Sequence, residues 1–297
     1  MTKFFKINKY LTLIIFFFSL ICLAFSGQKI DLDFANLICL FLILTIGVSH
    51  GSLDHLKGYK ILKIYKIQYK FLFYLIYILI SLMVILFWIF FPFIVLSFFL
   101  FIASYHFGKE DSSFLKVRKQ NFTNFYFFLK GSLVVLAPLW ANPEETVKIF
   151  EILNVELKFF NNDIIFSFIG ISILSNLFIS KNAIFGLLDS FSIIVLNVVF
   201  SPLVAFTLYF CFLHSIRHTL SLVEEIDGKN FTSGVGSFIK KALPLTLMTA
   251  IIFVASVYIL KNYYILDDAI LKVIFIGLAS LTFPHILLEY IIEKNEK

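Results

Sequence analysis

The chain has 297 residues, of which 60% are hydrophobic and only 15% charged, and its mean hydropathy is +0.94. A soluble domain has roughly half apolar and a quarter charged residues, so this composition excludes an ordinary water-soluble protein and predicts a multi-span membrane protein. The net charge of +6 is spread over loop lysines with no basic patch, which argues against a nucleic-acid partner.

The N-terminal segment is basic and then apolar. Lys3, Lys6 and Lys9 precede an apolar run over residues 11–25. This pattern fits a retained membrane helix, which we favour, or a signal peptide with a loose cleavage pattern near residue 26.

Ten apolar stretches are predicted to cross the membrane as helices. They are residues 11–25, 35–50, 71–91, 93–107, 121–140, 164–179, 183–200, 203–213, 242–260 and 270–288. Some are shorter than the roughly 20 residues that a bilayer requires, so we expect an all-α transmembrane bundle of about 8–10 spans.

The charges of the connecting segments predict their sides. Residues 56–70 carry five lysines and are expected to form an interfacial helix, and residues 116–119 are also basic. Residues 142–163 are acidic, and residues 221–241 are expected to form a polar cytoplasmic loop. The positive-inside rule then places the basic segments and both termini in the cytoplasm.

The histidines follow this topology. All six (His50, His55, His106, His214, His218 and His285) fall at or near ends of apolar stretches, and the predicted topology places these ends on the cytoplasmic side. Ionisable groups are rare at the edge of membrane spans and are usually functional there. Because histidine is the commonest metal ligand, the pattern predicts one metal site at the cytoplasmic helix ends.

Helical spacing indicates which imidazoles share a face. Residues i and i+4 differ by about 40° around a helix, so His214 and His218 can chelate one ion. His50 and Asp54 have the same spacing, which places Asp54 beneath His50 unless Gly51 breaks the helix. His55 lies about 140° away and is expected to have a supporting or structural role instead of binding the ion.

Further polar residues in the same motifs are expected to support the ligands. Tyr105, Glu110 and Asp111 surround His106, and Glu289 lies one turn after His285, which could support or bind the ion. Arg217 is expected to pair with an acid such as Glu110, Asp111 or Glu289, or to reach the headgroups.

Imidazole ligands suit iron, zinc, copper or nickel. A di-iron hydroxylase or desaturase would need more histidines than six, and a metal or proton transporter would place polar groups nearer the bilayer centre. A b-type cytochrome would be expected to have histidines at both leaflets. No phosphate-binding glycine loop or serine nucleophile motif is present.

Four motifs together resemble the Brp/Blh family of membrane β-carotene 15,15′-dioxygenases. They are HGSLDH (50–55), SYHFGKED (104–111), HSIRH (214–218) and PHILLE (284–289), and the resemblance covers roughly residues 35–290.

The resemblance implies a non-haem Fe(II) enzyme that cleaves β-carotene with O2 at its central double bond into two retinals, which could pass to a microbial rhodopsin. It implies the iron ligands His50, His106, His214 and His218, with no catalytic residue beyond them. Residues 1–30 would be an anchor or signal-like segment and 31–297 the transmembrane catalytic domain, in a bacterial inner membrane. The residues expected around the ligands are Asp54, His55, Tyr105, Glu110, Asp111, Arg217, His285 and Glu289.

Overall fold

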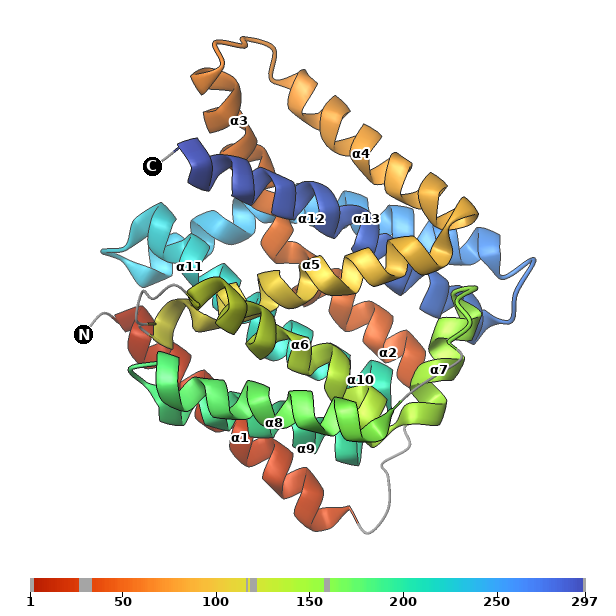
Figure 1. Cartoon of the computed structure of the whole chain (residues 1–297). Helices are drawn as coiled ribbons and strands as arrows, with labels where there is room; N and C mark the ends of the chain where they lie inside the picture. The colour runs from red at the N-terminus through yellow and green to blue at the C-terminus, as the bar shows by residue number, and fades with distance from the viewer. Residues whose placement is uncertain (1–2, 27–33, 116, 118–121, 158–160, 296–297) are drawn as a thin grey trace.

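A computed structural model describes residues 3–26, 34–115, 117, 122–157 and 161–295 (Figure 1). The described residues form helices and their connections, with one isolated β-bridge between Val117 and Ser180. The predicted all-α fold is therefore confirmed. The α-helices are α1 (Lys3–Phe25), α2 (Ala35–Leu42), α3 (Asp54–Ile64), α4 (Phe71–Phe90), α5 (Pro92–Ser112), α6 (Thr123–Ala141), α7 (Pro143–Ile152), α8 (Asn162–Ile179), α9 (Ala183–Val199), α10 (Pro202–Tyr209), α11 (Ile216–Asp227), α12 (Phe231–Leu260) and α13 (Leu266–Asn295).

Four shorter helical segments of other types adjoin these. η1 (Ile43–Gly47) and η4 (Phe210–Ser215) are π-helical, whereas η2 (Val48–Leu53) and η3 (Ser113–Leu115) are 3₁₀-helical. They join neighbouring α-helices into longer rods, so that residues Ala35–Ile64 and Pro202–Asp227 each form one crossing.

Among the described residues, nine helical segments are long and apolar enough to cross a membrane, and α9 is a shorter apolar helix. With α9, the segments correspond one to one to the ten predicted stretches. The multi-span helical bundle is thus confirmed, and a membrane explains it physically because backbone polar groups in lipid must bond within their own helix.

Sequence signals explain several helix boundaries. Pro92, Pro143 and Pro202 each occupy the first turn of a helix, where a missing N–H costs nothing. The side chain of Asn161 accepts hydrogen bonds from backbone N–H groups at the start of α8, and that of Asn230 does so for α12.

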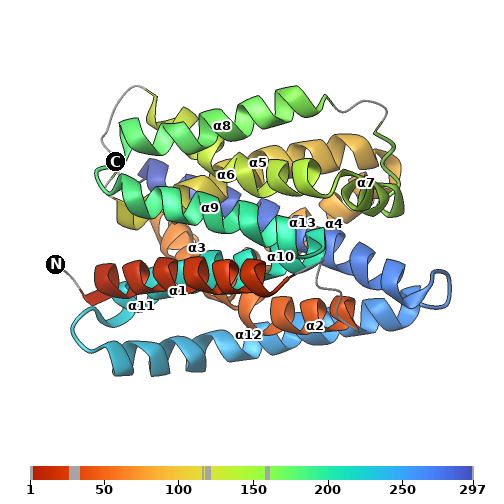
Figure 2. The same cartoon turned by 90° about the horizontal axis from the view of Figure 1, so that it is seen from below.

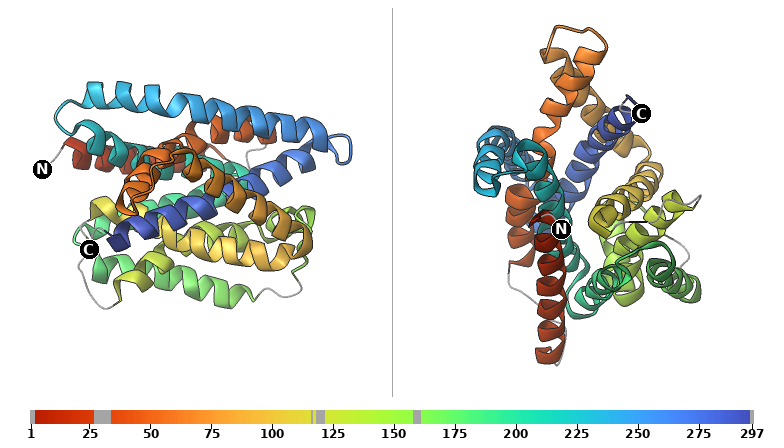
Figure 3. Two further views of the ribbon diagram at one scale, coloured as in Figure 1. Left: turned by 90° about the horizontal axis from the view of Figure 1, so that it is seen from above. Right: turned by 90° about the vertical axis from the view of Figure 1, so that its left-hand side faces the viewer.

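The helices run side by side along one direction, with α12 along one face of the bundle and α8 along the opposite face (Figures 2 and 3). The start of α1 and the end of α13 lie at one end, and α7 lies at the other (Figures 1 and 2). An even number of crossings brings the start of α1 and the end of α13 to the same end of the bundle.

Helices α5 and α6 approach each other closely at two glycines. A Cβ atom added to Gly108 would lie 1.7 Å from the carbonyl oxygen of Phe127, and one added to Gly131 would lie 1.8 Å from that of Ser104. Small residues allow such backbone contact between membrane helices. This contact fixes the end of α5 that carries His106, Glu110 and Asp111.

Two segments differ from the expectation. The predicted polar loop over residues 221–241 is mostly helix, because Val223 of α11 and Phe238 of α12 are buried together in an apolar cluster with Phe4 and Leu53. The acidic connection over residues 142–163 contains α7, whose Phe150 is buried.

The interfacial segment predicted over residues 56–70 is helical only as far as Ile64, where α3 ends. Its position at the membrane interface stays a prediction.

Some predictions fall on residues outside the described ranges. Lys116, Arg118 and Lys119 of the second basic segment are among them. The predicted boundary between residues 1–30 and 31–297 also lies there.

Candidate metal centre

Five of the six histidines gather in the interior of the bundle. They are His50 on η2, His106 on α5, His214 on η4, His218 on α11 and His285 on α13, and all are buried. Ring centroids are 5.1 Å apart for His50 and His218, 5.1 Å for His106 and His285, and 5.4 Å for His106 and His214. Motifs that lie far apart in sequence thus form one site.

Two π-helical segments position His50 and His214. A Cβ atom on Gly47, at the end of η1, would lie 2.6 Å from the Phe210 ring at the start of η4, so only glycine fits without a shift. The Ser215 hydroxyl donates a hydrogen bond to the Gly47 carbonyl at 3.2 Å. π-Helical turns occur frequently at functional sites, and here both lead directly to a clustered histidine.

Three of the imidazoles are held by carboxylates through their Nδ1 atoms. The distances are 3.3 Å from His214 to Asp111, 3.0 Å from His218 to Glu110, and 2.9 Å from His285 to Asp54. Because a carboxylate accepts, each Nδ1 carries the proton and donates it, which leaves the Nε2 lone pair free. This is the arrangement that typically orients histidine ligands of metals.

One ring nitrogen in each of four clustered histidines has no hydrogen-bond partner among the described residues. These buried atoms are Nε2 of His214, His218 and His285, and Nδ1 of His50. Each unpaired buried polar atom costs about 1–3 kcal/mol, so four in one cluster are hard to explain by packing alone. Clustered imidazole nitrogens without hydrogen-bond partners fit iron or another imidazole-binding transition metal.

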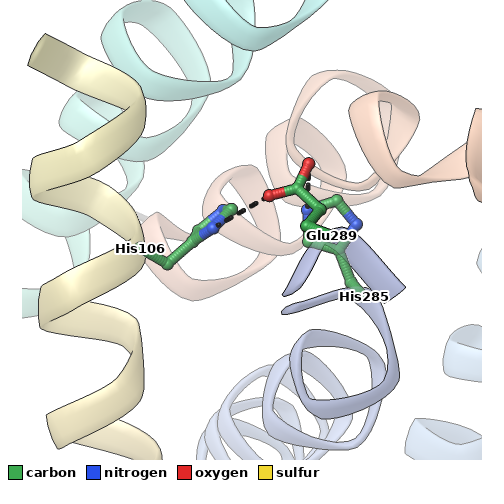
Figure 4. A group of neighbouring side chains, drawn as sticks. All are labelled: His106, His285 and Glu289. Carbon is green, nitrogen blue, oxygen red and sulfur yellow. Dashed lines mark ion pairs between the residues drawn. The ribbon is translucent and has the colours of Figure 1, made fainter. Parts of the chain in front are cut away.

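Glu289 lies at the edge of this ring cluster. Its Oε2 is 3.6 Å from Nδ1 of His106, and its Oε1 is 3.8 Å from Nε2 of His285 (Figure 4). The same Oε1 is 3.8 Å from Nε2 of His218 and 2.9 Å from Nζ of Lys57. Two groups of ligand-type atoms within 4.8 Å of one another result, His106 with His285 and Glu289, and Glu110 with His218 and Glu289.

Asp54 does not lie beneath His50 as its spacing suggested. Both oxygens of Asp54 are 2.9 Å from Nδ1 of His285, and the Tyr77 hydroxyl donates to Asp54. The reason is η2, because four residues of a 3₁₀-helix turn about 120° beyond a full circle instead of the roughly 40° of an α-helix.

His55 and Tyr105 lie outside the cluster. Nδ1 of His55 is 2.9 Å from the Ser52 carbonyl, to which it donates, and its ring stacks on Tyr74. The Tyr105 hydroxyl donates to Asn124. Neither residue contacts the five clustered rings through any of these interactions.

Arg217 has a partner that the sequence analysis did not consider. Its guanidinium donates two hydrogen bonds to Asp189 of α9 at 2.9 and 2.7 Å, while Asp111 lies 3.9 Å away. Thr12 of α1 accepts from Arg217 at 2.6 Å and donates to Asp189 at 3.1 Å. Of the three acids expected to pair with Arg217, only Asp111 is within ion-pair distance.

Further residues of this network were also missed. Lys130 lies 3.6 Å from Asp189 and donates to the backbone carbonyl of Asp111, and the Tyr209 hydroxyl donates to the Asp111 carboxylate at 2.6 Å. Asp189 and Lys130 are each the sole charged residue of their helix. That isolation is a sequence signal that could have indicated a buried polar network.

The fold and the site together define a polytopic helical membrane protein with a buried, carboxylate-supported cluster of histidines. Residues 41–293 match the family model described as Beta-carotene 15,15′-dioxygenase, and the chain belongs to this family of enzymes. The resemblance stated from the four motifs and the predicted enzyme class are thereby confirmed.

A relative supports the same assignment. The chain is 28% identical to a protein named Beta-carotene 15,15′-dioxygenase from the uncultured marine bacterium 66A03. The alignment extends over 257 residues and covers 84% of this chain and 90% of that protein. No solved structure matches the chain.

Proposed function

We propose that this protein cleaves β-carotene at its central 15,15′ double bond with O2, giving two molecules of retinal. The observation that carries the proposal is the cluster of buried imidazoles with unpaired nitrogens, on the motifs of a β-carotene 15,15′-dioxygenase family. We place the protein in a bacterial inner membrane with both termini in the cytoplasm, where retinal could pass to a microbial rhodopsin.

We propose that a non-haem Fe(II) is held by His50, His106, His214 and His218. When bound, Fe(II) would activate O2 for reaction with the polyene, while the electrons that reduce O2 come from the double bond that is cleaved. The neighbouring carboxylates fix the orientation of two of these imidazoles: Asp111 holds His214, and Glu110 holds His218. His285 has the same geometry through Asp54, so it is placed either to bind the ion or to support a ligand.

Apolar side chains complete the surroundings that this reaction needs. The Phe107 ring centroid lies 4.7 Å from that of His214, and the Phe210 ring stacks on His214 at 5.8 Å. Such aromatic walls exclude water and favour contact with a hydrocarbon substrate that enters from the lipid. Holding the central double bond beside the site supplies much of the rate advantage of the reaction.

Expression in a bacterium that makes β-carotene tests the proposal. We expect the wild-type chain to convert β-carotene to retinal, measured by chromatography of extracts, and purified protein to contain iron. His214→Ala and His218→Ala should lose both iron and activity, because each removes a donor from the cluster. His55→Ala is the matched control and should keep both, since His55 lies outside the cluster.

Two results would count against the proposal. Unchanged β-carotene despite folded, iron-loaded protein would contradict the activity. Full iron occupancy in each single histidine variant would contradict the ligand assignment but not the proposed activity.

A further inference from the structure

A polar pocket of about 250 Å³ lies next to the histidine cluster. Its lining residues come from α3, α5, α11 and α13. The end of α13 lies at the same end of the bundle as the start of α1 (Figure 1). It is lined by Lys57, Lys60, Glu110, His218, Ser221, Leu222, Glu225, Glu289, Ile292 and Glu293.

The pocket carries an excess of negative charge. Its lining has four carboxylates, those of Glu110, Glu225, Glu289 and Glu293, but only two lysines. Lys109 adds one more cation at the rim, where it pairs with Glu293, and the acids still outnumber the lysines. The lining is of mixed sign with a net negative charge, and a net negative cleft concentrates cations.

The inner wall of the pocket has the geometry of a cation site. Ligand-type atoms of Glu110, His218 and Glu289 lie within 4.8 Å of one another. His218 is only 4% exposed, and its Nε2 faces this group, 3.8 Å from Glu289, without a hydrogen-bond partner among the described residues. Glu110 holds the other nitrogen of this ring, Nδ1, at 3.0 Å, so the imidazole lies between two carboxylates and keeps one nitrogen unpaired. Imidazole nitrogen and carboxylate oxygen are donors that suit a divalent transition metal.

Glu289 belongs both to the pocket and to the ring cluster. It shares one group of ligand-type atoms with Glu110 and His218, and a second with His106 and His285 (Figure 4). The ammonium of Lys57 contacts its Oε1 at 2.9 Å on the pocket side. Lys57 therefore balances the charge of this carboxylate at the position where an arriving cation would bind.

We propose that this pocket is the route by which a divalent metal ion enters the histidine cluster from water. The ion first binds Glu110, His218 and Glu289, displaces Lys57, and then moves past the Glu289 carboxylate to the buried imidazoles. This inference rests on the proposed function only in assuming that the cluster holds a metal.

The rate of metal loading tests the route. The full-length protein, stripped by a chelator in detergent, is mixed with Co(II), and the visible absorbance of bound Co(II) is followed by stopped flow. Glu225→Gln removes a negative charge at the exposed pocket rim, while Lys60→Gln frees Glu225 from its ion pair at 2.6 Å. At low ionic strength we expect loading about 3–5-fold slower in the first variant and about 3–5-fold faster in the second.

The controls separate this route from the proposed function. Glu151→Gln makes the same change on α7 at the opposite end of the bundle, and its loading rate should equal that of wild type (Figure 1). The Co(II) stoichiometry should not change in any of these variants, and about 1 M salt should remove the rate differences.

Equal rates for both rim variants at low salt, or changes of the same sign, would overturn the entry route while leaving the metal site intact. Failure of every variant and of wild type to bind Co(II) or Fe(II) would overturn the metal site, and the entry route with it.

Discussion

At the scale of single residues, the buried pair of Arg217 and Asp189 links the site to the first helix. Arg217 stands between His214 and His218 in sequence, and its charge is neutralised mainly by Asp189. Both side chains are 2% exposed. Removing one partner of such a pair leaves an uncompensated buried charge, whereas removing both does not.

We therefore predict that Asp189→Asn lowers the free energy of unfolding by about 3–5 kcal/mol. The double variant Asp189→Leu with Arg217→Met should be less destabilised than Asp189→Leu alone or Arg217→Met alone. Unfolding of detergent-solubilised protein, followed by circular dichroism, measures the free energy of unfolding of each single variant and of the double variant. If the double variant loses as much stability as the two single variants combined, the ion pair does not have this role.

The sequence predicts the histidines of the site better than the partners of those histidines. His214 on η4 and His218 on α11 both lie in the ring cluster, as their i,i+4 spacing suggested, although η4 is π-helical. Asp54 was assigned to the wrong imidazole because η2 interrupts the α-helical period, and Gly51 within it signals a possible break without giving the new geometry. Asp189 carries a signal in its isolation, but only the tertiary structure identifies Arg217 as its partner.

At the scale of elements, the contact between α5 and α6 determines where three site residues lie. Gly108 and Gly131 let the two backbones touch, and α5 bears His106, Glu110 and Asp111 just beside that contact. A side chain at either glycine must push the helices apart, since the atoms in the way belong to backbone.

We predict that Gly131→Ala lowers the free energy of unfolding by about 1–3 kcal/mol, as overpacking of a tight interior does. Gly170→Ala on α8 is the matched control, because no atom lies within 4 Å of its added Cβ. That control should be neutral, or stabilising by up to about 1 kcal/mol. Melting temperatures measure both, and equal destabilisation by the two substitutions would contradict the close helix contact.

Hydropathy predicts the crossings well because lipid leaves the backbone few alternatives to a helix. It does not predict the polar segment over residues 221–241, where Val223 and Phe238 are buried although most of their neighbours are polar. Their apolar stripe becomes recognisable only when its packing partners, Phe4 and Leu53, are known.

At the scale of the whole molecule, α3 and α7 lie at opposite ends of the bundle (Figure 1). Lys63 at the end of α3 and Glu151 on α7 are both exposed. Cysteines introduced there should therefore react from opposite sides of the membrane.

We predict that a membrane-impermeant maleimide labels Lys63→Cys only from the cytoplasmic side and Glu151→Cys only from the outer side. The parent for this measurement has Cys22, Cys39 and Cys211 replaced by alanine, because these are the three native cysteines. Labelling of both positions from one side would contradict the bundle, whereas exchanged sides would contradict only the proposed orientation.

The contact of Thr12 with Arg217 also has a consequence for the timing of assembly in the cell. The two residues are 205 positions apart, so α1 meets this polar partner only after the intervening 204 residues have been synthesised. At roughly 5–20 residues per second, Thr12 waits roughly 10–40 s for Arg217 to be made. During that interval α1 must remain near the insertion machinery, and the histidine cluster cannot mature before the last helix, which carries His285, has joined it.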